Sequence, residues 1–162
     1  MLLSIAATAE DVYILGPGDK LKITVFGNED VSRDVEVDPS GQISLPLIQK
    51  VPASGKSIAQ LQEDIFERLS PDYIKNPKIT IEILTYRPFY IYGEVQRPGS
   101  YPYTAGMTVV NAVAVAGGFT YRADKDDIVI SRGTGDGRKT FRADRTDTVK
   151  PGDVLEIKER YF

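Results

Sequence analysis

A Pro-Gly-Asp turn followed by an alternating strand pattern occurs twice in this chain, and it constrains the fold more than any other feature. The two copies are Pro17-Gly18-Asp19-Lys20-Leu21-Lys22-Ile23 and Pro151-Gly152-Asp153-Val154-Leu155-Glu156-Ile157. Proline fixes φ at the second position of a turn, glycine accepts the positive φ that follows, and aspartate bonds to the nearby backbone. Each copy therefore predicts a turn that starts a half-buried strand.

Composition predicts two small modules and narrows the possible functions. The 162 residues are 41% hydrophobic, with isoleucine, valine and leucine spread along the chain. The net charge of -3, with both signs interspersed, provides no basic stripe for nucleic acid. The absence of cysteine and histidine excludes thiol chemistry, imidazole catalysis and the usual zinc sites. We therefore expect no nucleic-acid partner, no cofactor and no metal.

Residues 1–11 are predicted to be the remnant of a secretory signal peptide or a disordered N-terminus. A short apolar run over residues 1–5 precedes Ala7-Thr8-Ala9, a small-residue pattern typical of the end of a signal peptide. An N-terminus without structure is the equal alternative. In either case we expect the folded part to begin near Asp11.

Residues 12–86 are predicted to form the first module. Apolar and polar side chains alternate over residues 20–26, 43–47 and 79–83, which predicts three strands of one sheet. The turn signal Asp38-Pro39-Ser40-Gly41 lies between Val35 and Val37 on one side and Ile43 on the other, and it predicts a hairpin between the strands that carry these residues.

Each module is predicted to contain one helix. Ser57 and Gln60 have the spacing of a capping box, and the residues that follow form one apolar stripe that we expect to face inward. The stripe consists of Ile58, Leu61, Ile65, Phe66 and Leu69. In the second module, residues 109–116 are predicted to form a helix of small residues, with Thr108 as its N-cap and Gly117-Gly118 as its end.

The second module is predicted to span residues 87–162. Tyr86-Arg87-Pro88 marks the boundary, because strand patterns flank a proline that cannot donate to a central ladder. We expect strands over residues 89–95 and 128–131, a further strand through Phe141, and the strand of the second Pro-Gly-Asp copy. Strands with one helix packed on one face make an α+β architecture, which is the predicted fold class of both modules.

Tyrosine supplies the strongest site signal. Six of the nine tyrosines lie within residues 86–121. Tyr90 and Tyr92 share one strand face, and we expect Tyr101 and Tyr103 to share another. Flat rings with a polar tip suit sugar surfaces and protein interfaces. A purely structural role stays open for each ring, since half-exposed strands are rich in tyrosine.

Acidic residues provide two weaker alternatives. The carboxylates available for glycan hydrolysis are Glu82, Glu94, Asp124 and Glu156. The sequence shows no separation between them, and a glycosidase is recognised by that separation. Asp124, Asp126 and Asp127 could gather a hard cation, but the glycine and final glutamate of an EF-hand are missing. This pattern favours a solvated acidic turn.

Four stretches of the chain resemble the outer-membrane polysaccharide export family of Gram-negative cell envelopes. Residues 13–27 and 37–47 are similar to the opening strand and the hairpin of its export module. Residues 93–101, with residues 108–118, are similar to the strand, turn and helix that open a soluble-ligand-binding β-grasp (SLBB) module. Residues 149–157 are similar to the closing strand of that module. The stretches cover nearly the whole chain in the family's order.

This resemblance implies a short family member with a polysaccharide export module over residues 12–86 and one β-grasp SLBB module over residues 87–162. It implies a non-enzymatic role without catalytic residues, in which the chain lines or gates the conduit for a capsule polysaccharide or exopolysaccharide. The implied partners are the polysaccharide, further copies in a ring, an inner-membrane polysaccharide copolymerase and a separate outer-membrane protein. The implied location is the periplasm, in association with the outer membrane.

The predicted contact residues lie beside a turn that we expect to be exposed. For contact with glycan or with a neighbouring subunit we predict Tyr90, Tyr92, Arg97, Tyr101 and Tyr103. The alternative is a monomeric periplasmic module that binds or senses a glycan or another ligand, because fold does not fix function. No residue is predicted to bind a cofactor or a metal.

Overall fold

The computed structural model describes residues 12–133 and 135–161, and the chain divides into two compact units. The first unit ends at Leu84 and the second begins at Thr85. Each unit combines strands with one α-helix among its described residues, which confirms the predicted α+β class. The predicted signal-peptide remnant lies outside the described residues.

The first unit contains two small sheets. A three-stranded sheet has the order β2-β1-β5, and a two-stranded sheet consists of β3 and β4. The strands are β1 (Lys20–Val25), β2 (Arg33–Glu36), β3 (Gln42–Leu45), β4 (Gln49–Pro52) and β5 (Ile79–Thr85). β1 pairs with β2 and β3 pairs with β4, both antiparallel. In β1 the buried side chains alternate with exposed ones, as the sequence predicts.

Two expectations for this unit are wrong. Residues 43–47 do not join the sheet of β1 and β5, because β3 pairs with β4 and places Ile43 opposite Val51. The turn at Asp38 forms, with the Gly41 N–H donating to the Asp38 carbonyl at 2.8 Å, but it does not close a hairpin. It passes the chain from one sheet to the other. Alternation specifies a strand and its buried face, whereas the partner strand depends on the rest of the core.

The helix of the first unit, α1 (Ile58–Leu69), begins with the predicted capping box. The Gln60 N–H donates to the Ser57 hydroxyl at 3.2 Å, and the Ser57 N–H donates to the Gln60 side-chain oxygen at 2.9 Å. The buried face consists of Leu61, Ile65 and Leu69. Phe66, which we expected to face inward, is 38% exposed. Because it directly follows Ile65, it lies about 100° further round the helix.

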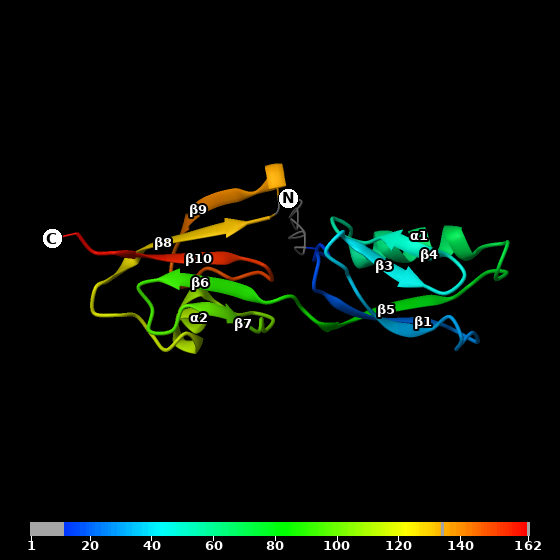
Figure 1. The fold of residues 1–162 in the computed structure, drawn as a ribbon, viewed down its shortest axis with the longest axis horizontal. Helices are drawn as coiled ribbons and strands as arrows, with labels where there is room; N and C mark the ends of the chain where they lie inside the picture. The colour runs from blue at the N-terminus through cyan, green and yellow to red at the C-terminus, as the bar shows by residue number, and fades with distance from the viewer. Residues whose placement is uncertain (1–11, 134, 162) are drawn as a thin grey trace, which may run out of the picture. The chain divides into compact units, whose positions relative to one another are not determined.

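The second unit has one five-stranded sheet with the order β7-β6-β10-β8-β9 (Figure 1). Its strands are β6 (Phe89–Gly93), β7 (Gly99–Tyr101), β8 (Ala123–Arg132), β9 (Lys139–Ala143) and β10 (Val154–Glu159). β6 and β10 pair in parallel, and the other neighbouring pairs are antiparallel. The strand of the second Pro-Gly-Asp copy, β10, thus lies at the centre of the sheet.

The helix of the second unit, α2 (Val109–Val115), packs on one face of this sheet. The side-chain oxygen of Asn111 accepts hydrogen bonds from the Thr108 N–H at 3.0 Å and from the Thr108 hydroxyl at 2.7 Å. Gly117 and Gly118 follow the helix with φ of 89° and 94°, as the sequence predicts. Fully buried partners of α2 in the sheet are Phe89, Ile91, Ile128, Ile130, Leu155 and Ile157. The opposite face of the sheet therefore carries the residues that lie between these on each strand.

Candidate functional site

The two Pro-Gly-Asp turns have the same backbone hydrogen-bond pattern. The Asp19 N–H donates to the Gly16 carbonyl at 3.2 Å, and an Asp19 carboxylate oxygen accepts from the Gly16 N–H at 2.9 Å. The equivalent distances between Asp153 and Lys150 are 3.1 Å and 2.7 Å. The glycine before each aspartate has a positive φ, 96° and 81°. Both carboxylates are fully buried, so each turn fixes the start of its strand.

The two buried carboxylates differ in their further partners. The Tyr13 hydroxyl donates to Asp19 at 2.7 Å. Asp153 accepts from the Nε and the terminal nitrogen of Arg132, at 2.9 Å and 2.7 Å. The Arg132 guanidinium also lies 5.1 Å from the centroid of the Phe141 ring. These contacts hold the turns in place, and we assign both aspartates a structural role.

The face of the second sheet opposite α2 forms a surface of tyrosine and charged side chains, which we call the open face. Strand register arranges it in two rows. The first row is Tyr90, Val154, Ser131 and Thr140, and the second row is Tyr92, Glu156, Val129 and Arg142. All eight side chains are half-buried or exposed. Because β10 lies between β6 and β8, its side chains Val154 and Glu156 lie between the tyrosines of β6 and the residues of β8.

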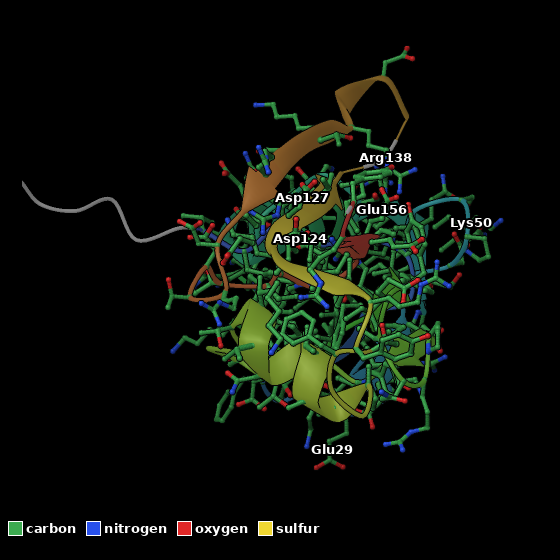
Figure 2. The ribbon with its side chains drawn as sticks, turned by 90° about the vertical axis from the view of Figure 1, so that its left-hand side faces the viewer. Glu29, Lys50, Asp124, Asp127, Arg138 and Glu156 are labelled. Carbon is green, nitrogen blue, oxygen red and sulfur yellow. The ribbon has the colours of Figure 1, made fainter. Side chains whose placement is uncertain are left out.

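A small charge network lies on the open face. Lys158 donates to Glu156 at 2.7 Å, and Arg142 lies 3.2 Å from Asp127 (Figure 2 labels Glu156 and Asp127). The hydrogen bond from Lys158 holds the pKa of the Glu156 carboxyl below its ordinary value, and the Tyr92 hydroxyl adds to this effect. The same hydrogen bond raises the pKa of Lys158. Burial and then Glu156 raise the pKa of Tyr92. The charged side chains Glu156, Lys158, Arg142 and Asp127 are therefore each paired with a neighbour of opposite charge.

Replacing Lys158 with methionine is expected to raise the pKa of Glu156 toward the ordinary value of 4.5. In the native chain the pKa of Glu156 is lower in the folded state than in the unfolded state. Ionised Glu156 therefore stabilises the fold at pH values above the unfolded-state pKa of about 4.5, and this contribution is lost as the pH falls through the lower folded-state pKa. A carbon-13 NMR titration of the Glu156 carboxyl measures the shift, with Lys125→Met as the control. An unchanged midpoint in Lys158→Met would contradict the assigned hydrogen bond.

Three of the five predicted contact residues are exposed. Tyr90 and Tyr92 are each 47% exposed and lie side by side on the open face. Arg97 is exposed in the segment between β6 and β7, and its N–H donates to the Ala116 carbonyl at 2.8 Å. These three side chains are accessible to a ligand, and their role as contacts stays a prediction.

The other two predicted contact residues are half-buried. Tyr101 lies opposite Phe89 on the α2 side of the sheet, with ring centroids 6.1 Å apart, and its hydroxyl donates to the Arg97 carbonyl. Tyr103 packs edge-on against Tyr86 at 5.3 Å, and burial raises its pKa. The five predicted residues therefore do not form one surface, and these two tyrosines support the core of the unit.

Three aspartates that we expected in a solvated turn lie in a strand. Asp124, Asp126 and Asp127 lie within β8, so the predicted acidic turn is wrong. Glu94 accepts from the Thr120 hydroxyl at 2.5 Å. Among the described residues, no group of three or more acidic, histidine or cysteine side chains is placed to hold a metal ion. In the same part of the chain, no helix is long and apolar enough to cross a membrane.

Comparison with known proteins identifies both units. A family model described as polysaccharide biosynthesis/export protein matches residues 7–84, and an SLBB domain model matches residues 88–142. The chain is 39% identical to the exopolysaccharide production protein ExoF of Rhizobium meliloti, over 70% of this chain and 30% of ExoF. It is 32% identical to the polysialic acid transport protein KpsD of Escherichia coli, over 75% of this chain and 22% of KpsD.

A further relative is the EPS I polysaccharide export outer membrane protein EpsA of Ralstonia nicotianae, 25% identical over 88% of this chain and 40% of EpsA. The chain thus spans less than half the length of each of these relatives. The family model is described by polysaccharide biosynthesis and export, and these relatives are named for polysaccharide production, transport and export, which agrees with the non-enzymatic export role that the sequence predicts. The two matches follow the order of the two units, and the chain belongs to the polysaccharide biosynthesis/export protein family, with an export unit followed by an SLBB domain.

Proposed function

We propose that this chain is a non-catalytic component of a capsule or exopolysaccharide export machine, and that its SLBB unit contacts the polymer or a neighbouring copy. The observation that carries the proposal is the pair of family matches, which cover the export unit and then the SLBB unit in that order. The relatives that are 25–39% identical to this chain are named for polysaccharide production, transport and export.

The open face has properties that suit a surface along which a polymer moves. Tyr90 and Tyr92 offer two partly exposed rings, which stack on sugar rings with little dependence on the identity of the sugar. Glu156 and Arg142 are already paired with neighbouring charges, so the face offers hydrogen bonds without a strong net charge. Contacts of this kind are weak and repeated, as passage without tight binding requires.

The remaining elements of the proposal concern assembly and location. A ring forms when the same pair of unlike surfaces repeats around an axis and closes. We place such a ring of copies in the periplasm near the outer membrane, between an inner-membrane copolymerase and a separate outer-membrane protein. In this arrangement the chain lines or gates part of the polymer path.

Deletion of the gene in its host is expected to remove most polysaccharide from the cell surface and to leave polymer in the periplasm. Complementation with the native chain should restore surface polysaccharide. The double variant Tyr90→Ala/Tyr92→Ala should restore less than Tyr73→Ala, the replacement of an exposed tyrosine in the other unit. The measurement is the amount of polysaccharide in surface and periplasmic fractions.

Unchanged surface polysaccharide in the deletion strain would overturn the export role. Saturable binding of a small soluble ligand by a monomeric chain would then support the alternative, a periplasmic ligand-binding module. Light scattering on the purified chain, with and without the copolymerase, tests the ring separately. Monomers under both conditions would contradict it.

A further inference from the structure

The SLBB unit has a pocket at the start of β8, apart from the residues of the open face. Its volume is about 310 Å³, at the lower end of the range of small-molecule sites, which is about 300–1,000 Å³. The side chains that matter here are Thr120, Tyr121, Asp124, Lys125, Asp126 and Arg160. They come from the segment before β8, from β8 itself and from the residue after β10.

Tyr121 presents its ring to solvent from a backbone that is held in place. The ring is 85% exposed. The Thr120 N–H donates to the Glu94 carbonyl at 3.1 Å, the Ala123 N–H donates to the Thr120 carbonyl at 3.2 Å, and Arg160 donates to the Tyr121 carbonyl at 2.7 Å. A tyrosine side chain has only two rotatable angles, so on a fixed backbone it loses little conformational entropy on binding, and this ring is suited to act as a ligand platform.

The charged groups of the pocket include carboxylates, which accept hydrogen bonds, and cations, which donate them. One Asp124 oxygen accepts from the Asp126 N–H at 3.0 Å, and its other oxygen has no partner among the described residues (Figure 2 labels Asp124). The Lys125 ammonium lies 5.8 Å from the centroid of the Phe119 ring and has no ion-pair partner in the described part of the chain. Arg160 supplies a second cation. Two carboxylates and two cations therefore line the pocket, and one of the carboxylates, Asp126, also lies 3.7 Å from Arg145.

This mixture of charges selects the chemical class of the ligand. An anion would meet the carboxylates Asp124 and Asp126, and a cation would meet Lys125 and Arg160, with Arg145 beside Asp126, so neither finds a site lined only by charges of the opposite sign. A neutral sugar has hydroxyl groups that donate to carboxylates and accept from cations, in charge-assisted hydrogen bonds. The carbon-bound hydrogens of its ring can pack on the Tyr121 ring.

We propose that this pocket binds an uncharged sugar residue of a polysaccharide. The inference rests on the proposed function, because the family assignment is what makes a polysaccharide the expected polymer. It goes beyond that function by naming a second contact site and the class of sugar that the site takes. A polymer bound here is held at a fixed point while its remaining residues contact other surfaces.

Titration of the nitrogen-15-labelled chain with neutral tetrasaccharides of glucose, galactose and mannose tests the pocket by NMR. With at least one of them we expect chemical-shift changes at residues 120–126 and 160. Tyr121→Ala and Asp124→Asn are each expected to weaken binding by about tenfold, because the first removes the aromatic ring and the second replaces a charge-assisted hydrogen bond with a neutral one. Tyr73→Ala is the matched control, an exposed tyrosine of the other unit, and it should leave the affinity unchanged.

Three outcomes would overturn the inference: no shift changes with any of the three sugars, changes at Tyr90 and Tyr92 in place of the pocket, or tighter binding of tetragalacturonate, an anionic probe. Failure of the proposed function has a different signature. If deletion removes surface polysaccharide but the pocket binds no neutral sugar, the export role stands and the pocket inference is wrong. If the pocket binds and deletion leaves export unchanged, the pocket stands and the export role is wrong.

Discussion

Replacing Asp153 with alanine is expected to destabilise the SLBB unit by about 3 kcal/mol. Its carboxylate is fully buried and accepts two hydrogen bonds from Arg132 and one from the Lys150 N–H. Removing one partner of a buried ion pair leaves the other charge without compensation, which costs about 3–5 kcal/mol. Because the Arg132 side chain is 31% exposed and keeps some hydration, we expect a value at the lower end of this range.

Urea unfolding followed by tyrosine fluorescence measures this effect in the second unit, which contains Asp153. The chain has no tryptophan, and seven of its nine tyrosines lie in the second unit. Asp136→Ala, at an exposed position between β8 and β9, is the control and should stay within about 0.5 kcal/mol of the native chain. The double variant Arg132→Met/Asp153→Ala should regain part of the loss, because it also removes the unpaired charge. Stability of Asp153→Ala close to that of Asp136→Ala would contradict the assigned role.

The two Pro-Gly-Asp turns illustrate how far the sequence predicts this fold. Turn chemistry and alternation are local, so the turns, β1 and β10 follow from the residues themselves. The capping box of α1 is equally local. The further partners of the two aspartates, Tyr13 and Arg132, depend on tertiary structure, and no spacing in the sequence indicates them.

The sheets of the first unit were less predictable, for a physical reason. β4 carries a single buried side chain, Val51, and ends in Pro52, which weakens any strand pattern. Because the sequence of β4 gives no clear strand pattern, the alternation of residues 43–47 alone predicts pairing within the sheet of β1 and β5. Strand pairing is decided by which apolar faces meet, and this is not encoded in any one segment.

The candidate contact surface also has a part that the local sequence predicts and a part that depends on tertiary structure. That Tyr90 and Tyr92 share a face follows from the two-residue period of a strand. That Tyr101 lies on the opposite face requires the register of β6 with β7. Glu156 lies beside Tyr92 only because β10 pairs with β6, and Arg142 joins the same row only through the pairing of β10 with β8 and of β8 with β9, so both positions require the strand order. The alternation of residues 154–158 was the available signal, but it does not identify the neighbouring strands.

Replacing Gly93 with alanine is expected to have the largest effect of any glycine substitution in the strands of the second sheet, about 3–5 kcal/mol of lost stability. Gly93 has a φ of +91°, which strains any residue with a side chain. An added Cβ would also lie 2.2 Å from the Ile157 carbonyl oxygen. This atom belongs to the backbone of β10, and it already accepts a hydrogen bond from the Glu94 N–H at 2.9 Å. Relief of the clash therefore requires separation of two central strands.

Two other glycines separate the strain from the clash. Gly106 has a φ of +80° and open space around the position of a Cβ, so Gly106→Ala should cost only the left-handed conformation, about 1 kcal/mol. Gly137 has open space and no left-handed φ, so Gly137→Ala should be close to neutral. Unfolding of the three variants by urea gives the clash as the difference between Gly93→Ala and Gly106→Ala. If that difference is zero, β6 and β10 can separate without cost, and the fixed position of Tyr92 opposite Glu156, on which the open face depends, is wrong.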